Sequence, residues 1–167
     1  MEIIYRDDDA NVYTCCTMFK ELHEKFISAK QTHTAAVLMK DLWNNHALFW
    51  YLINAPYMSV QLHGWEHKDY SKLSYDECYG DLKKSVEYWN TNATRMMSKP
   101  APKINTFFAP WNHSSPTIKK ACADLGLKFC DVSSPNTLTS SQWDGRELVS
   151  FHWWNCMDNN FHLKGIF

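Results

Sequence analysis

The sequence contains no long apolar segment and no leader of the usual secretory kind. Its longest wholly apolar stretch, residues 47–53, is far shorter than a membrane-spanning helix requires. The N-terminus has no basic region followed by an apolar segment and a cleavage site. These absences predict a soluble, cytoplasmic protein that does not interact with a membrane.

An excess of charge of one sign is also lacking. The net charge of the 167 residues is −1 at pH 7, and the basic residues are scattered along the chain. Nucleic-acid-binding surfaces are normally basic, so we expect no nucleic-acid partner and a small or neutral ligand instead. At this length a single domain, residues 1–167, is expected to bury its own core. Composition does not define the oligomeric state.

The six cysteines form no recognisable framework. They include one adjacent doublet, Cys15 and Cys16, and no C-x-x-C pair. In a chain of this size we interpret them as free thiols in a reducing compartment.

Strand-like and helix-like segments alternate along the chain. Apolar patterns of strand length cover residues 2–6, 34–39, 57–62, 104–109, 127–132 and 147–152. Helical spacing of apolar residues covers residues 17–30, 41–54 and 115–126, and a long segment that begins at a Ser74/Glu77 capping box. This alternation predicts an α/β fold with a largely parallel sheet, either open or closed into a barrel.

Candidate functional side chains come at, or just after, the C-terminal ends of these predicted strands. They are Asp8, Asp9, His63, Trp111, Asp131 and His152. The C-terminal ends of parallel strands share one edge of a sheet or barrel, where active sites are assembled. We therefore expect these side chains to lie around one site.

Two histidines and a run of aspartates indicate a metal centre. His63 and His67 are four positions apart, a spacing that places both imidazoles within reach of one ion on a helix or tight turn. Asp7, Asp8 and Asp9 repel one another, and a divalent cation would remove that repulsion. Two histidines, one aspartate and a position for water form the ligand set of a hydrolytic zinc site. We expect Zn²⁺, with Co²⁺, Ni²⁺ and Fe²⁺ as alternatives.

The order of these motifs resembles that of the NodB-like polysaccharide deacetylases, a carbohydrate esterase family. Residues 6–10, 63–67, 108–112 and 151–153 carry the resemblance, which spans nearly the whole chain. It implies a distorted, incomplete (β/α) barrel. It also implies metal-dependent removal of acetyl groups from an N- or O-acetylated sugar or polysaccharide.

The resemblance further implies roles for individual residues. Asp8 corresponds to the general base and His152 to the general acid. The metal ligands correspond to Asp9, His63 and His67, and the substrate-binding positions to Pro110, Trp111, Asn112 and Trp153. Because three aspartates are consecutive, a register with Asp7 as base and Asp8 as ligand is also compatible with the pattern.

The sequence departs from the family pattern at one position. The family's third motif usually carries an arginine that orients the base, and Phe108 stands near that place. Arg6 is a candidate replacement, and Asp7 and Asp131 are further candidates for ordering the site. The chain is also short for the family, which allows for a missing element and a wide groove.

Two other kinds of protein compete with a deacetylase. One is a non-catalytic carbohydrate-binding or scaffold protein that keeps the fold with a degenerate site. The other is a different metal-dependent hydrolase or a non-haem iron protein, because two histidines and a carboxylate also bind Fe(II). The remaining histidines, and Trp65, Trp153 and Trp154, are interpreted mainly as packing residues.

Overall fold

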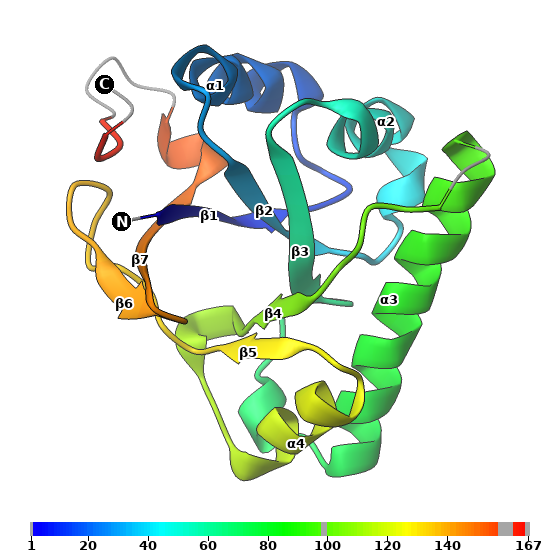
Figure 1. Ribbon diagram of the computed structural model, residues 1–167. Coiled ribbons are helices and arrows are strands. Elements are labelled where there is room, and N and C mark those ends of the chain that lie inside the picture. The colour runs from blue at the N-terminus through cyan, green and yellow to red at the C-terminus, as the bar shows by residue number, and fades with distance from the viewer. Residues whose placement is uncertain (1, 98–99, 157–161, 166–167) are drawn as a thin grey trace.

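A computed structural model describes residues 2–97, 100–156 and 162–165, which form one sheet with helices packed around it (Figure 1). The sheet has seven strands in the order β5-β4-β3-β2-β1-β7-β6. Their bounds are Ile3–Ala10 (β1), His33–Leu38 (β2), Met58–Gly64 (β3), Thr106–Phe108 (β4), Lys128–Cys130 (β5), Ser141–Trp143 (β6) and Arg146–His152 (β7). All neighbouring strands are parallel except β6 and β7. The predicted α/β class with a largely parallel sheet is confirmed.

Within the described residues, four α-helices connect the parallel strands. They are Cys16–Ala29 (α1), His46–Asn54 (α2), Tyr75–Met97 (α3) and Pro116–Asp124 (α4). The predicted capping box begins α3, where Ser74 N donates to Glu77 Oε2 over 2.8 Å and Glu77 N donates to Ser74 Oγ over 3.3 Å. Helices cover the sheet, so all six residues of β2 are buried.

Side chains close the curved sheet into a nearly complete barrel. Between edge strands β5 and β6, Trp143 Nε1 donates to the carbonyl oxygen of Phe129 over 3.2 Å, and Lys128 binds Asp144. The rings of Phe108 and Trp143 pack inside this seam with centroids 5.7 Å apart. The barrel is therefore closed by side chains at one seam, in agreement with the incomplete barrel that the motifs implied.

The structure corrects the predicted helix over residues 41–54. Asp41 has a φ of +55°, and a 3₁₀ turn occupies Leu42–Asn44 before α2 begins at His46. Asn45 separates the two segments, because its side chain accepts from Leu48 N and donates to the carbonyls of Val12 and Thr14. A side chain that caps the next helix and fastens a distant turn thus interrupts the helical spacing.

Strand β6 was not predicted. Its three residues, Ser141–Trp143, are too few to show an alternating pattern. Asp144 and Gly145, with φ values of 51° and 73°, join it to β7. An Asp-Gly pair in this conformation is a sequence signal for a two-residue hairpin.

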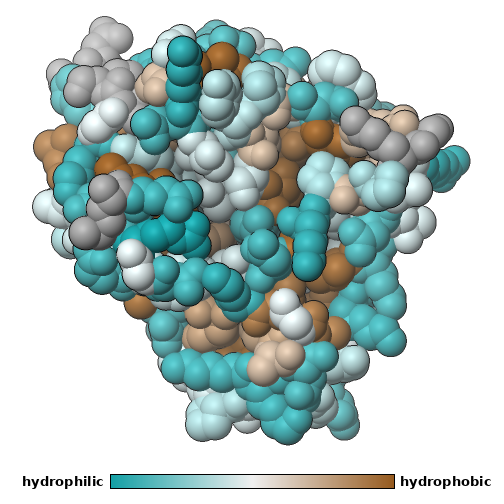
Figure 2. All heavy atoms as spheres, viewed as in Figure 1, coloured by the Kyte–Doolittle hydropathy of each residue, from teal (hydrophilic) through white to brown (hydrophobic). Residues whose placement is uncertain are grey.

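Hydrophilic residues cover most of the face seen in Figure 2, and hydrophobic residues show mainly in the hollows between them. Within the described part of the chain, no helix combines the length and apolar character needed to reach across a membrane. A few large apolar side chains are nonetheless well exposed, among them Tyr13, Trp111 and Trp154.

Candidate metal and catalytic site

A cavity of about 760 Å³ opens at the C-terminal edge of the barrel. Its lining includes seven of the candidate residues, namely Asp8, Asp9, His63, His67, Trp111, Asn112 and His152. They come from the ends of β1, β3 and β7 and from the segment after β4. The expected clustering at one edge of a parallel sheet is therefore observed for these residues.

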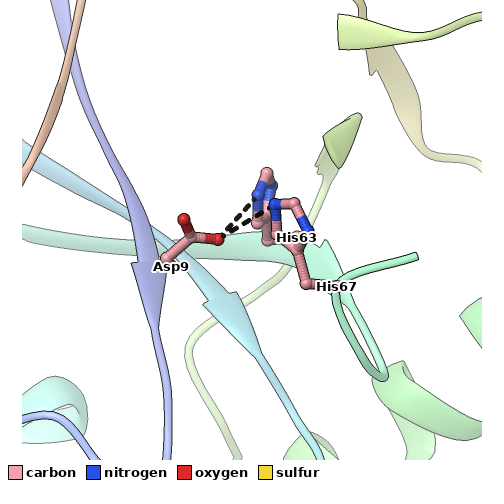
Figure 3. Close-up of side chains that lie close together, drawn as sticks. All are labelled: Asp9, His63 and His67. Carbon is pink, nitrogen blue, oxygen red and sulfur yellow. Dashed lines mark ion pairs between the residues drawn. The ribbon is translucent and has the colours of Figure 1, made fainter. Parts of the chain in front are cut away.

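Asp9 faces both imidazoles, which lie side by side at this edge (Figure 3). Its Oδ1 atom is 3.2 Å from His63 Nε2 and 3.3 Å from His67 Nε2. Asp9 has a φ of +68°, and the pairing of β1 with β2 shifts register beside it. This irregular backbone at the end of β1 sets the direction of the Asp9 carboxylate.

These three side chains fit a divalent metal ion. His63 Nδ1 is 2.8 Å from the carbonyl oxygen of Phe108, a contact that requires the proton on Nδ1 and leaves a lone pair on Nε2 toward Asp9. Asp9 Oδ1 is buried and has no hydrogen-bond partner of suitable geometry among the described residues. Two atoms that each bind a tetrahedral zinc ion at about 2.1 Å lie about 3.4 Å apart. The distances from Asp9 Oδ1 to His63 Nε2 and to His67 Nε2, 3.2 Å and 3.3 Å, match that arrangement.

The electrostatics of Asp9 agree with a ligand role. Burial raises the pKa of Asp9, but the neighbouring imidazoles, His152 foremost, outweigh burial, so that the pKa is lowered overall. Asp9 is therefore an anion at neutral pH, as a carboxylate ligand must be.

A tight loop brings His67 back beside His63. Gly64 has a φ of +123°, and a Cβ atom at this position would lie 2.4 Å from Tyr70 Oη. Trp65 N donates to Tyr70 Oη over 3.0 Å, and the Tyr70 hydroxyl donates to Asp81. Glycine is required at position 64 both for its backbone angle and for the close approach of the tyrosine.

Arg6 orients Asp8. Its Nε and Nη2 atoms donate to the two Asp8 carboxylate oxygens, each over 2.7 Å. Its Nη1 atom donates to Asn112 Oδ1 over 2.9 Å and to the carbonyl oxygen of Val132 over 2.6 Å. The guanidinium also lies over the Phe108 ring, 5.0 Å from its centroid. Arg6 thus orients the Asp8 carboxylate. The family pattern assigns this task to an arginine in the third motif, where this chain has Phe108.

His152 approaches the site from β7. Its Nε2 atom is 3.4 Å from Asp9 Oδ2, and this interaction raises the pKa of His152 against the opposing effect of burial. The Trp154 ring stacks on the imidazole with centroids 4.6 Å apart. His152 is therefore held at the cavity wall with its pKa raised from the ordinary value.

Asp7 points away from the cavity into the core. Its Oδ2 atom is 2.9 Å from His33 Nε2, His33 Nδ1 is 3.0 Å from His23 Nδ1, and His23 Nε2 is 2.9 Å from the Pro56 carbonyl oxygen. Burial raises the pKa of Asp7 well above its usual value and lowers the pKa of His33 to about 3 and of His23 to about 4. The structure thus groups Asp9, and not Asp7, with the two histidines of the candidate metal site.

Three other candidates do not line the cavity. Pro110 is buried, and Asp131 forms an ion pair with Lys119 over 3.4 Å. Trp153 packs against the hydrophobic core. Sequence reasoning missed further lining residues, including Ser133, Ser134, Asn136, Thr137, Ser150 and Asn155. The run of small polar residues after β5, at the C-terminal edge of the sheet, was the available signal.

Comparison with known proteins identifies the fold. No family model and no curated protein matches the sequence, whereas solved structures do. A family 4 carbohydrate esterase from Streptomyces lividans in complex with acetate has a TM-score of 0.69 at 16% identity over 92% of this chain and 79% of its own. A family 4 acetyl xylan esterase from Clostridium thermocellum, in complex with cobalt, has a TM-score of 0.64 at 15% identity, over 92% of this chain and 74% of its own. The chain therefore has the fold of the family 4 carbohydrate esterases, the NodB-like polysaccharide deacetylases.

The same fold also occurs with inactive sites. A mutant of BA3943 from Bacillus anthracis, a family 4 pseudoenzyme with restored enzymatic activity, has a TM-score of 0.70 at 15% identity over 90% of this chain. This chain spans 56% of that mutant's length and 42% of the wild-type chain. The fold alone therefore does not define activity, which must be argued from the site.

The Arg6 side chain is expected to be important for stability. In Arg6→Lys, the two parallel hydrogen bonds to Asp8 are lost while the positive charge remains, so the free energy of unfolding should fall by about 1–3 kcal/mol. Urea denaturation measures this change. The matched substitution Arg146→Lys alters an ion pair with Asp144 in which about a third of each side chain is exposed, and it should shift stability by less than about 0.5 kcal/mol. Equal effects of the two substitutions would contradict the role of Arg6.

Proposed function

We propose that the protein is a metal-dependent hydrolase that removes acetyl groups from an N- or O-acetylated sugar or polysaccharide. The observation that carries the proposal is the convergence of Asp9 Oδ1, His63 Nε2 and His67 Nε2 in the wall of an open cavity, with the oxygen 3.2 Å and 3.3 Å from the two nitrogens. Asp8 and His152 line the same cavity. A metal site with an acid and a base beside it is the arrangement that hydrolysis of an acyl group needs.

Asp9, His63 and His67 would hold the metal, with Zn²⁺ as the first choice. When bound, the ion would supply a Lewis acid for the acetyl carbonyl and for an attacking water. Asp8 accepts the proton from that water. Arg6 holds both Asp8 oxygens, so the carboxylate keeps a fixed direction as the proton moves.

Two further groups act on the reacting acetyl. His152 donates a proton to the departing amine or alcohol, a step that suits a histidine whose pKa is raised. The backbone N–H at Trp111 stabilises the oxyanion, a contact worth roughly 3 kcal/mol in related chemistry. The products are acetate and the deacetylated sugar.

A second candidate function is sugar binding without catalysis. The pseudoenzyme with this fold and the phenylalanine at position 108 favour it. Against it, Arg6 already makes the contact to Asp8 for which the missing arginine was expected. A non-catalytic protein would bind sugar without releasing acetate and would not respond to a chelator.

Acetate release separates these functions. We expect the zinc-loaded protein to release acetate from acetylated xylan or from N-acetylglucosamine oligomers, to lose this activity with a chelator, and to recover it when zinc is added back. Retention of full activity in the chelator would contradict the proposal, and so would the absence of acetate release from both substrates. Recovery with Fe²⁺ alone, accompanied by oxygen consumption, would indicate an iron protein instead.

Substitution of His152 tests its assignment as the acid. In His152→Gln, the rate constant kcat should fall by about 10²–10⁴, while the protein keeps its full metal content. Steady-state kinetics and elemental analysis of the same sample measure both quantities. Loss of metal from the variant would make His152 a ligand and remove the acid from the mechanism.

A further inference from the structure

A second cavity adjoins the catalytic cavity across His67. Its volume is about 310 Å³, and its lining includes Tyr13, Lys40, Trp65 and Glu66. His67 lines both cavities. Cavities of about 300–1,000 Å³ are the usual size of small-molecule sites. The binding surface therefore continues past the candidate metal ligands and is large enough for another group of the same molecule.

Tyr13 stands at the tip of a rigid turn beside this second cavity. Its side chain is 91% exposed, whereas the next most exposed large hydrophobic side chain among the described residues, Leu138, is 60% exposed. Asn11 fastens the turn, because its Oδ1 accepts from Tyr13 N over 2.8 Å and its backbone oxygen accepts from Thr14 N over 3.0 Å. Asn45 Nδ2 donates to the carbonyls on both sides of Tyr13.

An aromatic ring presented in this way is suited to binding. The turn is already ordered, so a ligand that covers the ring loses little backbone entropy. The exposed ring gains free energy when apolar surface covers it. The turn follows Asp9 directly, and Asn11 Nδ2 donates to the Asp9 carbonyl over 2.7 Å. The turn that carries Tyr13 is thus hydrogen-bonded to the backbone of a candidate metal ligand.

The polar groups of the second cavity complement the ring. Lys40 Nζ and Glu66 Oε1 pair over 2.6 Å with about half of each side chain exposed. Together they present donors and acceptors without adding net charge. One face of Trp65 is covered by Lys84, whose Nζ lies 3.7 Å from the ring centroid, so Tyr13 is the freer aromatic surface. An apolar face beside paired polar groups matches a neutral sugar unit, which has C–H faces and hydroxyl edges.

We propose that this second cavity, hereafter the Tyr13 subsite (Tyr13, Lys40, Trp65, Glu66 and His67), binds the sugar unit next to the acetylated one. The substrate is then an oligosaccharide or polysaccharide of at least two units, not a monosaccharide. The inference rests on the proposed function for the identity of the reacting unit. Beyond the proposed function, the Tyr13 subsite gives the minimum number of sugar units in the substrate and the residues that bind the second unit.

Binding as a function of chain length tests the Tyr13 subsite. Isothermal titration would compare the zinc-loaded protein with the monomer, dimer and tetramer of N-acetylglucosamine, and with acetylated xylose and its oligomers. In at least one of these two series, the affinity of the protein for the sugar should rise with the number of sugar units. Tyr13→Ala should reduce that rise by about tenfold, whereas Tyr13→Phe, which keeps the ring, should preserve it.

Trp50→Ala is the matched control. Trp50 is 55% exposed on α2 and lines neither cavity, so its removal should leave the dependence on chain length unchanged. The proposal is overturned if neither series shows a rise with length, or if Tyr13→Ala keeps the full rise.

Acetate release from the same samples distinguishes this inference from the proposed function. Binding that strengthens with length, without acetate release, supports the Tyr13 subsite and contradicts the deacetylase. Acetate release from monomer and tetramer with equal kcat/KM contradicts the subsite and supports the deacetylase.

Discussion

Replacing His63 by alanine is expected to abolish metal binding and acetate release together. His63 supplies one of the three candidate ligand atoms, and its position is held by the 2.8 Å contact to the Phe108 carbonyl. Loss of an outer-shell partner alone typically weakens metal affinity by about 10–100-fold, so loss of the ligand itself should exceed about 100-fold. Zinc titration with a competing chelator dye measures the change, and acetate release follows activity in the same preparation.

A histidine outside the site serves as the control for this substitution. His46 begins α2 and packs edge-on against Trp43. His46→Ala should retain both zinc affinity and activity. If His63→Ala kept wild-type metal content and turnover, the assignment of His63, Asp9 and His67 as one metal site would be wrong.

Asp8→Asn is expected to reduce kcat by about 10²–10⁴ while leaving the metal bound. Asparagine keeps the size of the side chain but cannot accept a proton from water as a carboxylate does. Asp9→Asn should instead lose the metal, because Asp9 faces both imidazoles. Comparing metal content with turnover in the two variants distinguishes base from ligand.

The alternative register makes the opposite prediction. With Asp7 as base and Asp8 as ligand, Asp8→Asn would lose metal and Asp9→Asn would keep it. Asp131→Asn provides a control outside the cavity, since Asp131 pairs with Lys119, and should leave both quantities unchanged. Metal loss in Asp8→Asn alone would require the assignment to move by one residue.

Much of the sheet could be predicted because its strands are buried and continuous. Residues 34–39, which include most of β2, form a largely apolar run of strand length, apolar residues alternate with polar ones in β3, and side chains that follow parallel strands meet at one edge. The placement of Asp8, Asp9, His63 and His152 around one cavity follows from this rule alone. The candidate pair of metal ligands, His63 and His67, could be predicted from its spacing alone.

The details within β1 were harder to predict. Strand alternation places Arg6 and Asp8 on one face and Asp7 on the other, and the structure shows this arrangement. The direction of Asp9 does not follow from alternation. It depends on the backbone irregularity at the end of β1, which arises from tertiary pairing with β2.

The positions of the aromatic residues near His152, the candidate acid, also depended on tertiary packing. Trp153 and Trp154 are adjacent tryptophans, so the sequence does not distinguish their roles. In the structure Trp153 packs against the core, whereas Trp154 is 43% exposed and stacks on His152. Their separation follows from the 3₁₀ turn Trp153–Cys156 after β7, for which the sequence has no strong signal.

The most direct test of this account is an anomalous-scattering map from crystals grown with zinc. The account predicts one strong peak per chain, about 2.0–2.2 Å from Asp9 Oδ1, His63 Nε2 and His67 Nε2. A fully loaded crystal with no peak between these atoms, or with the three side chains pointing apart, would contradict it.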